Sequence, residues 1–271
     1  MSKRVSLAAI ALAVSTTAAM AGSHCADGKT LTDGKLTIAT GNPAYYPWVM
    51  DNAPESGNGF EPAVAYAVAS KMGFEAADVI WVRSSFDEAI QPGPKSFDFN
   101  MQQFSITEAR EKVVDFSVPY YSAPMAVMVA ANAAETEASV EALRDLIWGG
   151  VGTTTAVPML TAIIQPNKDP MLYADTADVA AAMQAGQIDA AMFDLPTALY
   201  LSAVVVEGSK LLGQFPADRT ENPDQFGMLM EEGNPLKACV NEAINALAES
   251  GELAGIEAEW LQETTGVPLI D

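Results

Sequence analysis

The 271-residue sequence predicts an α/β protein with mostly parallel sheets. Short apolar segments, typical of buried strands, alternate with segments of helical periodicity along the whole chain. This alternation is typical of parallel strands that are connected by helices packed on the sheet. The length is sufficient for two lobes, each with a core of its own.

The expected strands are short, apolar and bounded by turn residues. They are 36–40, 79–82, 97–101, 113–117, 126–130, 188–193, 211–215 and 226–230. Helices are expected where apolar residues recur with helical spacing, or where a proline or threonine opens a segment and a glycine closes it. They are 62–72, 86–90, 139–147, 153–164, 176–185, 196–203, 235–248 and 252–261. Two prolines and a glycine make 41–48 a loop.

The first residues have the composition of a secretory signal peptide. Lys3 and Arg4 form a basic start, residues 5–14 are apolar, and the small residues at 19–21 are typical of a cleavage site. The apolar run is shorter than a membrane span. We therefore expect residues 1–21 to be removed before Gly22 and the mature chain to be exported to the periplasm.

Charge and residue usage exclude several classes of function. A formal net charge of −21 argues against nucleic acid and anionic membrane as partners. His24 is the only histidine, so a Ser-His-Asp triad, a Cys-His pair and a histidine-rich metal site are excluded. We expect no metal, no cofactor and no catalytic residue.

The sequence contains two cysteines, Cys25 and Cys239. Export into an oxidising compartment favours a disulfide between them. The alternative is two separate thiols.

Residues 97–121 combine a strand, a polar turn, a helical turn and a second extended segment. Arg110 follows the polar turn closely, and its guanidinium can hold a carboxylate through two parallel hydrogen bonds. The alternative is an ion pair with Glu108 or Asp115 on a solvated surface, and this stretch alone does not choose between the two.

The same stretch resembles the signature F-D-x6-S-I-T-x2-R-x5-F-S-x-P-Y-Y of the periplasmic solute-binding proteins for polar amino acids. The residues that match in register are Asp98, Ser105, Ile106, Thr107, Arg110, Phe116, Ser117, Pro119, Tyr120 and Tyr121. Weaker matches to the same family lie at 41–49, 59–61, 151–154, 187–194 and 233–235, so the resemblance extends from about residue 36 to residue 261.

The resemblance implies two α/β lobes joined by two crossing strands, with a ligand cleft between them that closes by hinge bending. Lobe 1 would contain residues 22–122 and 216–271, and lobe 2 would contain residues 123–215. The family implies a monomer that delivers its ligand to an ABC transporter permease in the inner membrane.

The resemblance also implies the ligand-binding residues of the first lobe. Tyr45 and Phe86 would be aromatic walls, with ordinary core packing as the alternative. Ser105 and Arg110 would hold a carboxylate, and Gln102 and Gln103 would line the same floor.

The residues implied for the second lobe are Thr153, Thr154 and Asp194. The two threonines open an expected helix, where free backbone N–H groups attract an anion, although simple N-capping is the alternative. Asp194 ends a buried strand and would take an ammonium group, or would only cap the helix that follows.

Four positions depart from the family pattern. Asn42 replaces the aspartate of basic-amino-acid binders, so we expect a neutral rather than a cationic ligand side chain. Ala63 replaces a second acid after the G-F-[DE] motif. Gln102 and Gln103 replace small residues, and two amides there reshape the pocket and add donors and acceptors.

We therefore expect a component of an ABC importer that binds a small amino acid or an amino-acid-like zwitterion. The second interpretation is a periplasmic dehydratase for prephenate-like acids on the same scaffold, for which Glu61, Asp87 and Asp194 are the nearby acids. The third is a sensor ectodomain, against which the absence of a membrane-spanning segment in the sequence counts.

Overall fold

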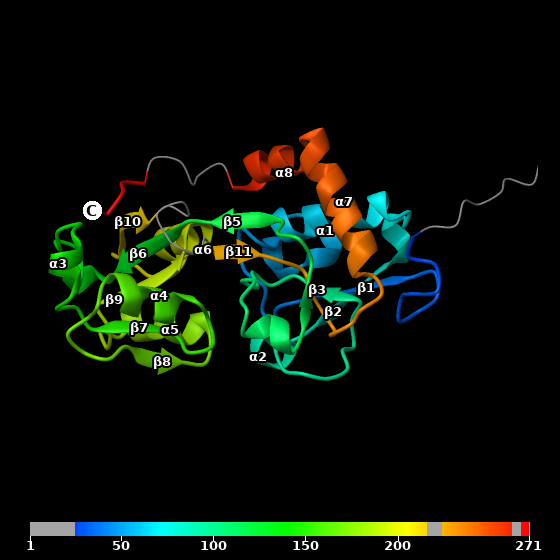
Figure 1. Ribbon diagram of the computed structural model, residues 1–271. Coiled ribbons are helices and arrows are strands. Elements are labelled where there is room, and N and C mark those ends of the chain that lie inside the picture. Colours follow the sequence, from blue (N-terminus) through cyan, green and yellow to red (C-terminus); the bar gives the residue numbers. More distant parts are fainter. Residues whose placement is uncertain (1–24, 216–223, 262–266, 271) are drawn as a thin grey trace, which may run out of the picture.

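A computed structural model describes residues 25–215, 224–261 and 267–270. Figure 1 shows two lobes side by side, each with helices packed around a sheet, and a narrow ribbon of two strands between them. The expected signal peptide, residues 1–21, and His24 lie outside the described residues.

The first lobe is built on a five-stranded sheet with the order β2-β1-β3-β12-β4. Its strands are β1 (Leu36–Thr40), β2 (Val79–Arg83), β3 (Phe99–Asn100), β4 (Asp115–Phe116) and β12 (Leu229–Met230). The strands β1, β2 and β3 pair in parallel, whereas β12 runs antiparallel to both of its neighbours. Phe60 and Phe99 are fully buried in this core, and each contributes about 1.5–3 kcal/mol by leaving water.

The second lobe repeats this plan with the order β10-β6-β9-β7-β8. Its strands are β6 (Met125–Val129), β7 (Trp148–Val151), β8 (Met171–Tyr173), β9 (Ala190–Asp194) and β10 (Lys210–Phe215). Every residue of β6 is buried, because hydrophobic clusters cover both faces of this strand. A run of small and apolar residues without alternation is the pattern of such a doubly covered strand.

The helices alternate with these strands. They are α1 (Phe60–Lys71), α2 (Phe86–Ala89), α3 (Val140–Leu143), α4 (Ala156–Ile163), α5 (Thr176–Gln184), α6 (Leu195–Tyr200), α7 (Lys237–Ser250) and α8 (Glu252–Trp260), with a π-helix at Leu201–Val205. Short 3-10 helices occur at Met50–Asn52, Pro54–Ser56, Ala76–Asp78, Arg110–Lys112 and Ala131–Ala133.

Gly59 precedes α1 with a φ of +109°, and a Cβ there would lie 2.6 Å from the Trp48 carbonyl oxygen. Glycine therefore lets α1 begin directly against the loop that carries Trp48.

The ribbon between the lobes consists of β5 (Tyr121–Ala123) and β11 (Asp224–Phe226), which pair antiparallel. The α/β, two-lobed fold with two crossings is therefore confirmed. The sheets are mixed rather than mostly parallel, because each contains two parallel and two antiparallel pairs of neighbours. In both sheets the antiparallel pairs involve strands that directly precede or follow a crossing, such as β6 and β12.

Residues 267–270 were expected in lobe 1, but in the structure they pack against lobe 2. Leu269 forms a parallel bridge with Gln214, and Ile270 is buried in the core of the second lobe. Gly213 makes this possible, since a Cβ at that position would lie 2.6 Å from Ile270 Cγ1. The chain end therefore extends the sheet of lobe 2 beyond β10.

Several local predictions change at their edges. The expected strand 97–101 is reduced to two residues, and 226–230 is split into β11 and β12 at Gly227. The helical turn expected within residues 97–121 is a 3-10 helix that begins only at Arg110. The strand β8 was not predicted, because Met171 and Leu172 are exposed at the sheet edge.

Cys25 and Cys239 are free thiols in the structure, so the disulfide expected between them stays a prediction. Cys239 is buried on α7, and its thiol is near enough to affect the pKa of Cys25. Partial burial, followed by the influence of Cys239, raises the pKa of Cys25 to about 12, which keeps its thiol protonated at neutral pH.

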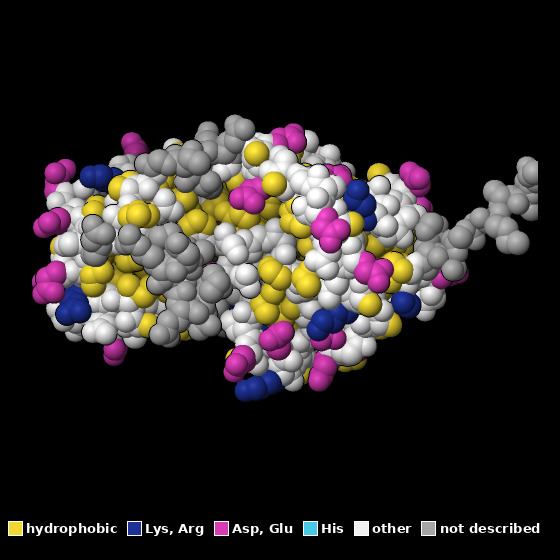
Figure 2. Space-filling model, turned by 45° about the horizontal axis from the view of Figure 1, so that its top comes forward, with side chains coloured by type: hydrophobic (Ala, Val, Ile, Leu, Met, Phe, Trp, Pro, Cys, Tyr) yellow, Lys and Arg dark blue, Asp and Glu magenta, His cyan; other side chains and the backbone are white. Residues whose placement is uncertain are grey.

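No helix among the described residues is long and apolar enough to cross a membrane. Figure 2 shows Asp and Glu side chains spread over the visible face, with fewer Lys and Arg side chains. This distribution agrees with the net charge of the sequence, −21.

Candidate functional site

A cavity of about 370 Å³ lies between the two lobes and is lined by residues of both. It brings together eight of the nine residues that the sequence implied for ligand binding. They are Tyr45, Phe86, Gln102, Gln103, Ser105, Arg110, Thr154 and Asp194.

Among the residues that the structure describes, Arg110 is the only Lys or Arg side chain that lines this cavity, and it is buried. Its Nη1 donates to the Ser105 carbonyl oxygen at 2.7 Å, and its Nη2 donates to the Thr153 carbonyl oxygen of the other lobe at 2.9 Å. A guanidinium has five N–H groups, so these two bonds leave donors free for a ligand. The surface ion pair with Glu108 or Asp115 is not formed. Burial lowers the pKa of Arg110, and Asp224 opposes that shift.

Phe86 supports Arg110 as well as lining the cavity. Its ring stacks on Phe104 with centroids 4.6 Å apart, and Arg110 Cζ lies 5.2 Å from its centroid. Ser85 caps α2 by accepting a hydrogen bond from the Glu88 backbone N–H, which fixes the start of the helix that carries Phe86.

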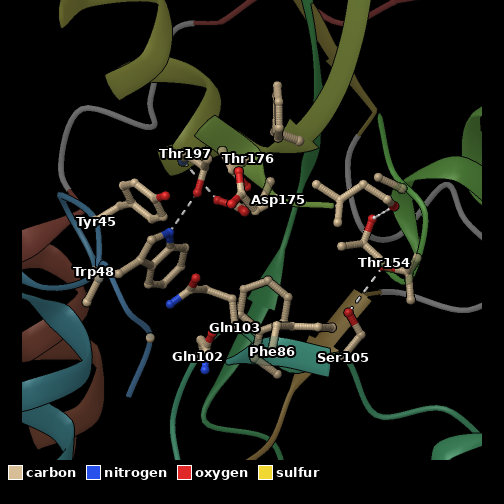
Figure 3. Close-up of a pocket in the computed structure, with 18 of the residues that line it drawn as sticks. Tyr45, Trp48, Phe86, Gln102, Gln103, Ser105, Thr154, Asp175, Thr176 and Thr197 are labelled. Carbon is tan, nitrogen blue, oxygen red and sulfur yellow. Dashed lines mark hydrogen bonds between the residues drawn. The ribbon is translucent and has the colours of Figure 1, made fainter. Parts of the chain in front are cut away.

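The aromatic loop at 41–49 forms one side of the cavity. Trp48 is buried, and its Nε1 donates to Thr197 Oγ1 across the cleft at 2.8 Å, as Figure 3 shows. In Figure 3 the Tyr45 hydroxyl points toward Thr197 of the other lobe. Burial and the charges of Asp175 and Asp178 raise the pKa of Tyr45. The aromatic wall expected at Tyr45 is therefore shared with Trp48.

A polar chain of contacts joins both lobes to a crossing strand. Ser105 Oγ and Thr155 Oγ1 are hydrogen-bonded at 3.1 Å, and Thr155 Oγ1 donates to Asp224 Oδ2 at 3.3 Å. Asp224 belongs to β11 and is buried. Its burial raises its pKa, while Ser105, Thr155 and Arg110 stabilise the carboxylate.

Thr153 is the implied residue that does not line the cavity. Its Oγ1 donates to Asp87 Oδ1 at 2.7 Å, so it fastens one lobe to the other at the cleft edge. The reason is that α4 begins at Ala156 rather than at 153, which places Thr154, Thr155 and Ala156 on the cavity wall instead.

Asp194 lies at the end of β9 and lines the cavity. Its Oδ1 accepts a hydrogen bond from the Thr197 backbone N–H at 2.8 Å, so it also caps α6. Burial raises the pKa of Asp194 to about 6, and Asp224 adds to that shift. The cap and the ligand contact are compatible, since a carboxylate has two oxygens that accept hydrogen bonds.

The cavity includes polar residues that the sequence did not identify as ligand-binding. Besides Thr40 and Ser85, they are Thr155, Asp175, Thr176, Thr197 and Asp224. Asp175 is the N-cap of α5 and accepts a hydrogen bond from the Asp178 backbone N–H, a pattern visible in the sequence as Asp-Thr-x-Asp before a helix. Nothing in the sequence indicates Asp224, because it enters the site from a crossing strand far along the chain.

The described residues contain no group of three or more His, Cys, Asp or Glu side chains that could hold a metal. A smaller cavity of about 240 Å³ also touches both lobes, but the described part of its lining has no charged residue. The larger cavity is therefore the candidate binding site.

Residues 36–263 match the model of the bacterial extracellular solute-binding proteins, family 3. The chain belongs to this family. It is a solute-binding protein, and its cavity between two lobes is the place where such a protein holds a solute.

This solute-binding protein is similar to characterised relatives. It is 27% identical over 225 residues to the arginine-binding periplasmic protein of Mannheimia haemolytica, a match that covers 81% of this chain and 88% of the relative. The structure of an ancestral arginine-binding protein bound to glutamine aligns with a TM-score of 0.68 and 25% identity, covering 84% of this chain and 98% of the other.

Two further structures share the fold. The arginine-, lysine-, histidine-binding protein of Geobacillus stearothermophilus aligns with a TM-score of 0.67 and 20% identity, covering 86% of this chain and 96% of the other. An ancestral amino acid-binding protein, a precursor of cyclohexadienyl dehydratase, aligns with a TM-score of 0.66 and 23% identity, covering 84% of this chain and 95% of the other.

Proposed function

We propose that this protein binds a small amino acid or amino-acid-like zwitterion in the cavity between its lobes and delivers it to an ABC importer. The observation that carries the proposal is the placement of Arg110 and Asp194 in one cavity, on walls from different lobes. A ligand with a carboxylate and an ammonium group would bridge the two, and its binding would favour the closed arrangement.

The relatives support the same class of ligand. The Mannheimia haemolytica relative is an arginine-binding periplasmic protein, and a neighbour from Streptococcus pneumoniae is an amino acid ABC transporter substrate-binding protein bound to L-arginine. We infer by analogy that this protein is a monomer that works in the periplasm with a permease of the inner membrane.

A thermal-shift screen over amino acids, their derivatives and small organic acids tests the proposal. A ligand that binds only the native state raises Tm by mass action, by an amount that grows with ligand concentration. We expect one or more α-amino acids to raise the Tm of the wild type, and we expect the same compounds to leave the Tm of the Arg110→Ala variant unchanged. A screen in which only non-amino acids shift Tm would contradict the zwitterion.

We also propose that the mature chain starts near Gly22 and forms the Cys25–Cys239 disulfide after export. The contact between the two thiols supports the bond, and an oxidising compartment would drive it. It would tie the start of lobe 1 to α7 and stabilise the fold by about 4–5 kcal/mol in the chain-entropy description. Mass spectrometry of a non-reduced digest tests it, and two alkylatable thiols in the protein from the periplasm would contradict it.

A dehydratase acting on prephenate-like acids is the second candidate. Asp194 favours this candidate, because its pKa of about 6 leaves part of its carboxyl groups protonated near neutral pH. It lines a cavity that could hold an acidic substrate. The other acids are engaged elsewhere, Glu61 with Tyr120 and Gln103, and Asp87 with Thr153. Incubation with prephenate decides between the candidates, since we expect no product beyond the uncatalysed reaction.

A further inference from the structure

Glu61 lies directly beneath the cavity without lining it. It is on the first turn of α1 and only 1% exposed. A buried carboxylate is costly unless hydrogen bonds satisfy it, and here three donors do so. The Tyr120 hydroxyl and the Gln103 backbone N–H donate to Oε1, at 2.5 and 2.9 Å, and Gln103 Nε2 donates to Oε2 at 2.6 Å.

These contacts determine which way the Gln103 amide faces. The side-chain NH₂ of Gln103 donates to Glu61 Oε2, so it faces Glu61. Its carbonyl oxygen then faces away from Glu61. Because Gln103 lines the cavity, that oxygen is the polar atom it offers to a ligand.

Gln102 is oriented in the same sense by a different partner. Its Nε2 donates to the Ser84 carbonyl oxygen at 3.3 Å, and its Oε1 lies toward Gly41, which lines the cavity. In Figure 3 the oxygen of each glutamine amide lies on the side of Thr197 and Asp175, and the nitrogen lies on the opposite side. The floor of the cavity therefore offers the ligand two amide carbonyl oxygens, which accept hydrogen bonds, rather than two NH₂ groups, which would donate them.

We propose that Glu61 is a positioning residue that holds the Gln103 carbonyl oxygen toward the cavity, so that the site selects a ligand whose side chain carries N–H donors and a positive charge. The proposal rests on the proposed function and names the ligand class for that site. Asp175, exposed at the cavity wall opposite Tyr45, supplies the negative charge for the same group. A guanidinium, which only donates, fits this surface, whereas a side-chain carboxylate would face acceptors and an acid.

This class differs from the neutral side chain expected from Asn42. That expectation considered one position, whereas the cavity also includes Asp175 and the two oriented amides. Leaving a buried acceptor without a donor lowers affinity by about 10- to 100-fold. We therefore expect the protein to bind L-arginine more tightly than L-citrulline by about that factor, and L-glutamate most weakly.

The test is calorimetry with L-arginine, L-citrulline and L-glutamate, on the wild type and on Glu61→Gln. In the variant, the amide oxygen of residue 61 still accepts from Tyr120 and from the Gln103 backbone. Its NH₂ then faces Gln103, whose amide must turn over and present its own NH₂ to the cavity. We expect the arginine-to-glutamate ratio of affinities to fall by about 10- to 100-fold.

Two further variants separate positioning from a general loss of structure. Glu55→Gln removes an exposed acid near the start of α1 and should leave the ratio unchanged. Gln103→Met fills a similar volume without an amide, so it should reduce the ratio, and adding Glu61→Gln to it should change the ratio no further.

An unchanged ratio in a folded Glu61→Gln protein would overturn the positioning role. A wild type that binds glutamate as tightly as arginine would overturn the ligand class while leaving the proposed function intact. A wild type that binds none of the three, nor any other α-amino acid, would remove the proposed function and this inference together.

Discussion

The two walls of the cavity differ in chemistry and in origin. The wall from lobe 1 carries the arginine, the aromatic rings and the two amides, and most of these residues come from 86–110. The wall from lobe 2 carries hydroxyls and carboxylates at the starts of α4, α5 and α6. The first wall thus comes from the loop at 41–48 and from residues 86–110, whereas the second is assembled from three separate helix starts.

The difference suggests a division of roles. Gln103 is held by Glu61 of its own lobe. Arg110 is held by the Ser105 carbonyl of its own lobe and by the Thr153 carbonyl of the other, so the first wall is formed largely within its own lobe. The second wall contributes the bonds that cross the cleft, from Thr155 to Ser105 and from Thr197 to Trp48. We expect the first wall to recognise the ligand and the second to complete closure.

The largest expected effect on binding is that of Arg110→Ala. Leaving a ligand carboxylate unpaired in a closed cavity costs about 2–5 kcal/mol of binding free energy. Arg110→Lys should also bind weakly, because an ammonium cannot reproduce the planar fork. Calorimetry with the screened ligand measures both losses, and normal affinity in the alanine variant would show that the first wall does not depend on its arginine.

A pH titration compares the buried acid of each lobe. Burial raises the pKa of Glu61 from 4.5 to about 7 and that of Asp194 from 3.8 to about 6. Below these values the native state binds more protons than the unfolded state, so the free energy of unfolding falls as pH rises from about 4 to 7. Each acid should contribute on the order of 3 kcal/mol to that loss.

Chemical denaturation at a series of pH values from about 4 to 8 measures this dependence. We expect Glu61→Gln to flatten the upper part of the curve and Asp194→Asn to flatten the lower part. Stability that rises with pH across this window would contradict both assignments.

Asp194→Asn tests the ammonium site of the second wall. Asparagine is an equally good N-cap, so the variant should keep α6 in place while it removes the negative charge. An α-amino acid should lose about 1.5–3 kcal/mol of binding free energy, and its des-amino analogue should lose little. If the wild type binds the des-amino acid more tightly than the α-amino acid, Asp194 does not hold an ammonium group and serves only as the N-cap of α6.

The smallest effect is expected for a bond across the cleft. Thr197→Val keeps the side-chain shape but removes the acceptor for Trp48 Nε1, and it should cost about 1 kcal/mol of affinity. Trp48→Phe removes the same bond from lobe 1. If the bond acts in closure, the double variant should lose no more than the larger single loss, whereas additive losses would mean that the two residues act separately.

Much of the first wall could be predicted from the sequence. The motif from Asp98 to Tyr121 places Ser105 five residues before Arg110, and the structure retains this short separation as a direct hydrogen bond. The α/β class could also be predicted, because apolar periodicity depends on neighbours along the chain. The ends of elements were less well predicted, as with α4, whose start depends on how the Gly152–Thr155 turn packs against lobe 1.

The remaining features depend on residues far apart in the sequence that meet only in the folded chain. Asp224 enters the cavity from β11. Ile270 joins the core of the second lobe, although the helices before it in the sequence, α7 and α8, belong to lobe 1. Glu61 was recognisable in the sequence as the acid of a helix-start motif, but its hydrogen bond to Gln103 joins residues 42 positions apart. The sequence by itself therefore determined the family, the lobes and the arginine wall, since these are written in local patterns. Tertiary structure decided the orientation of the amides and the acids of the second wall, because burial and hydrogen-bond partners exist only once the lobes are packed.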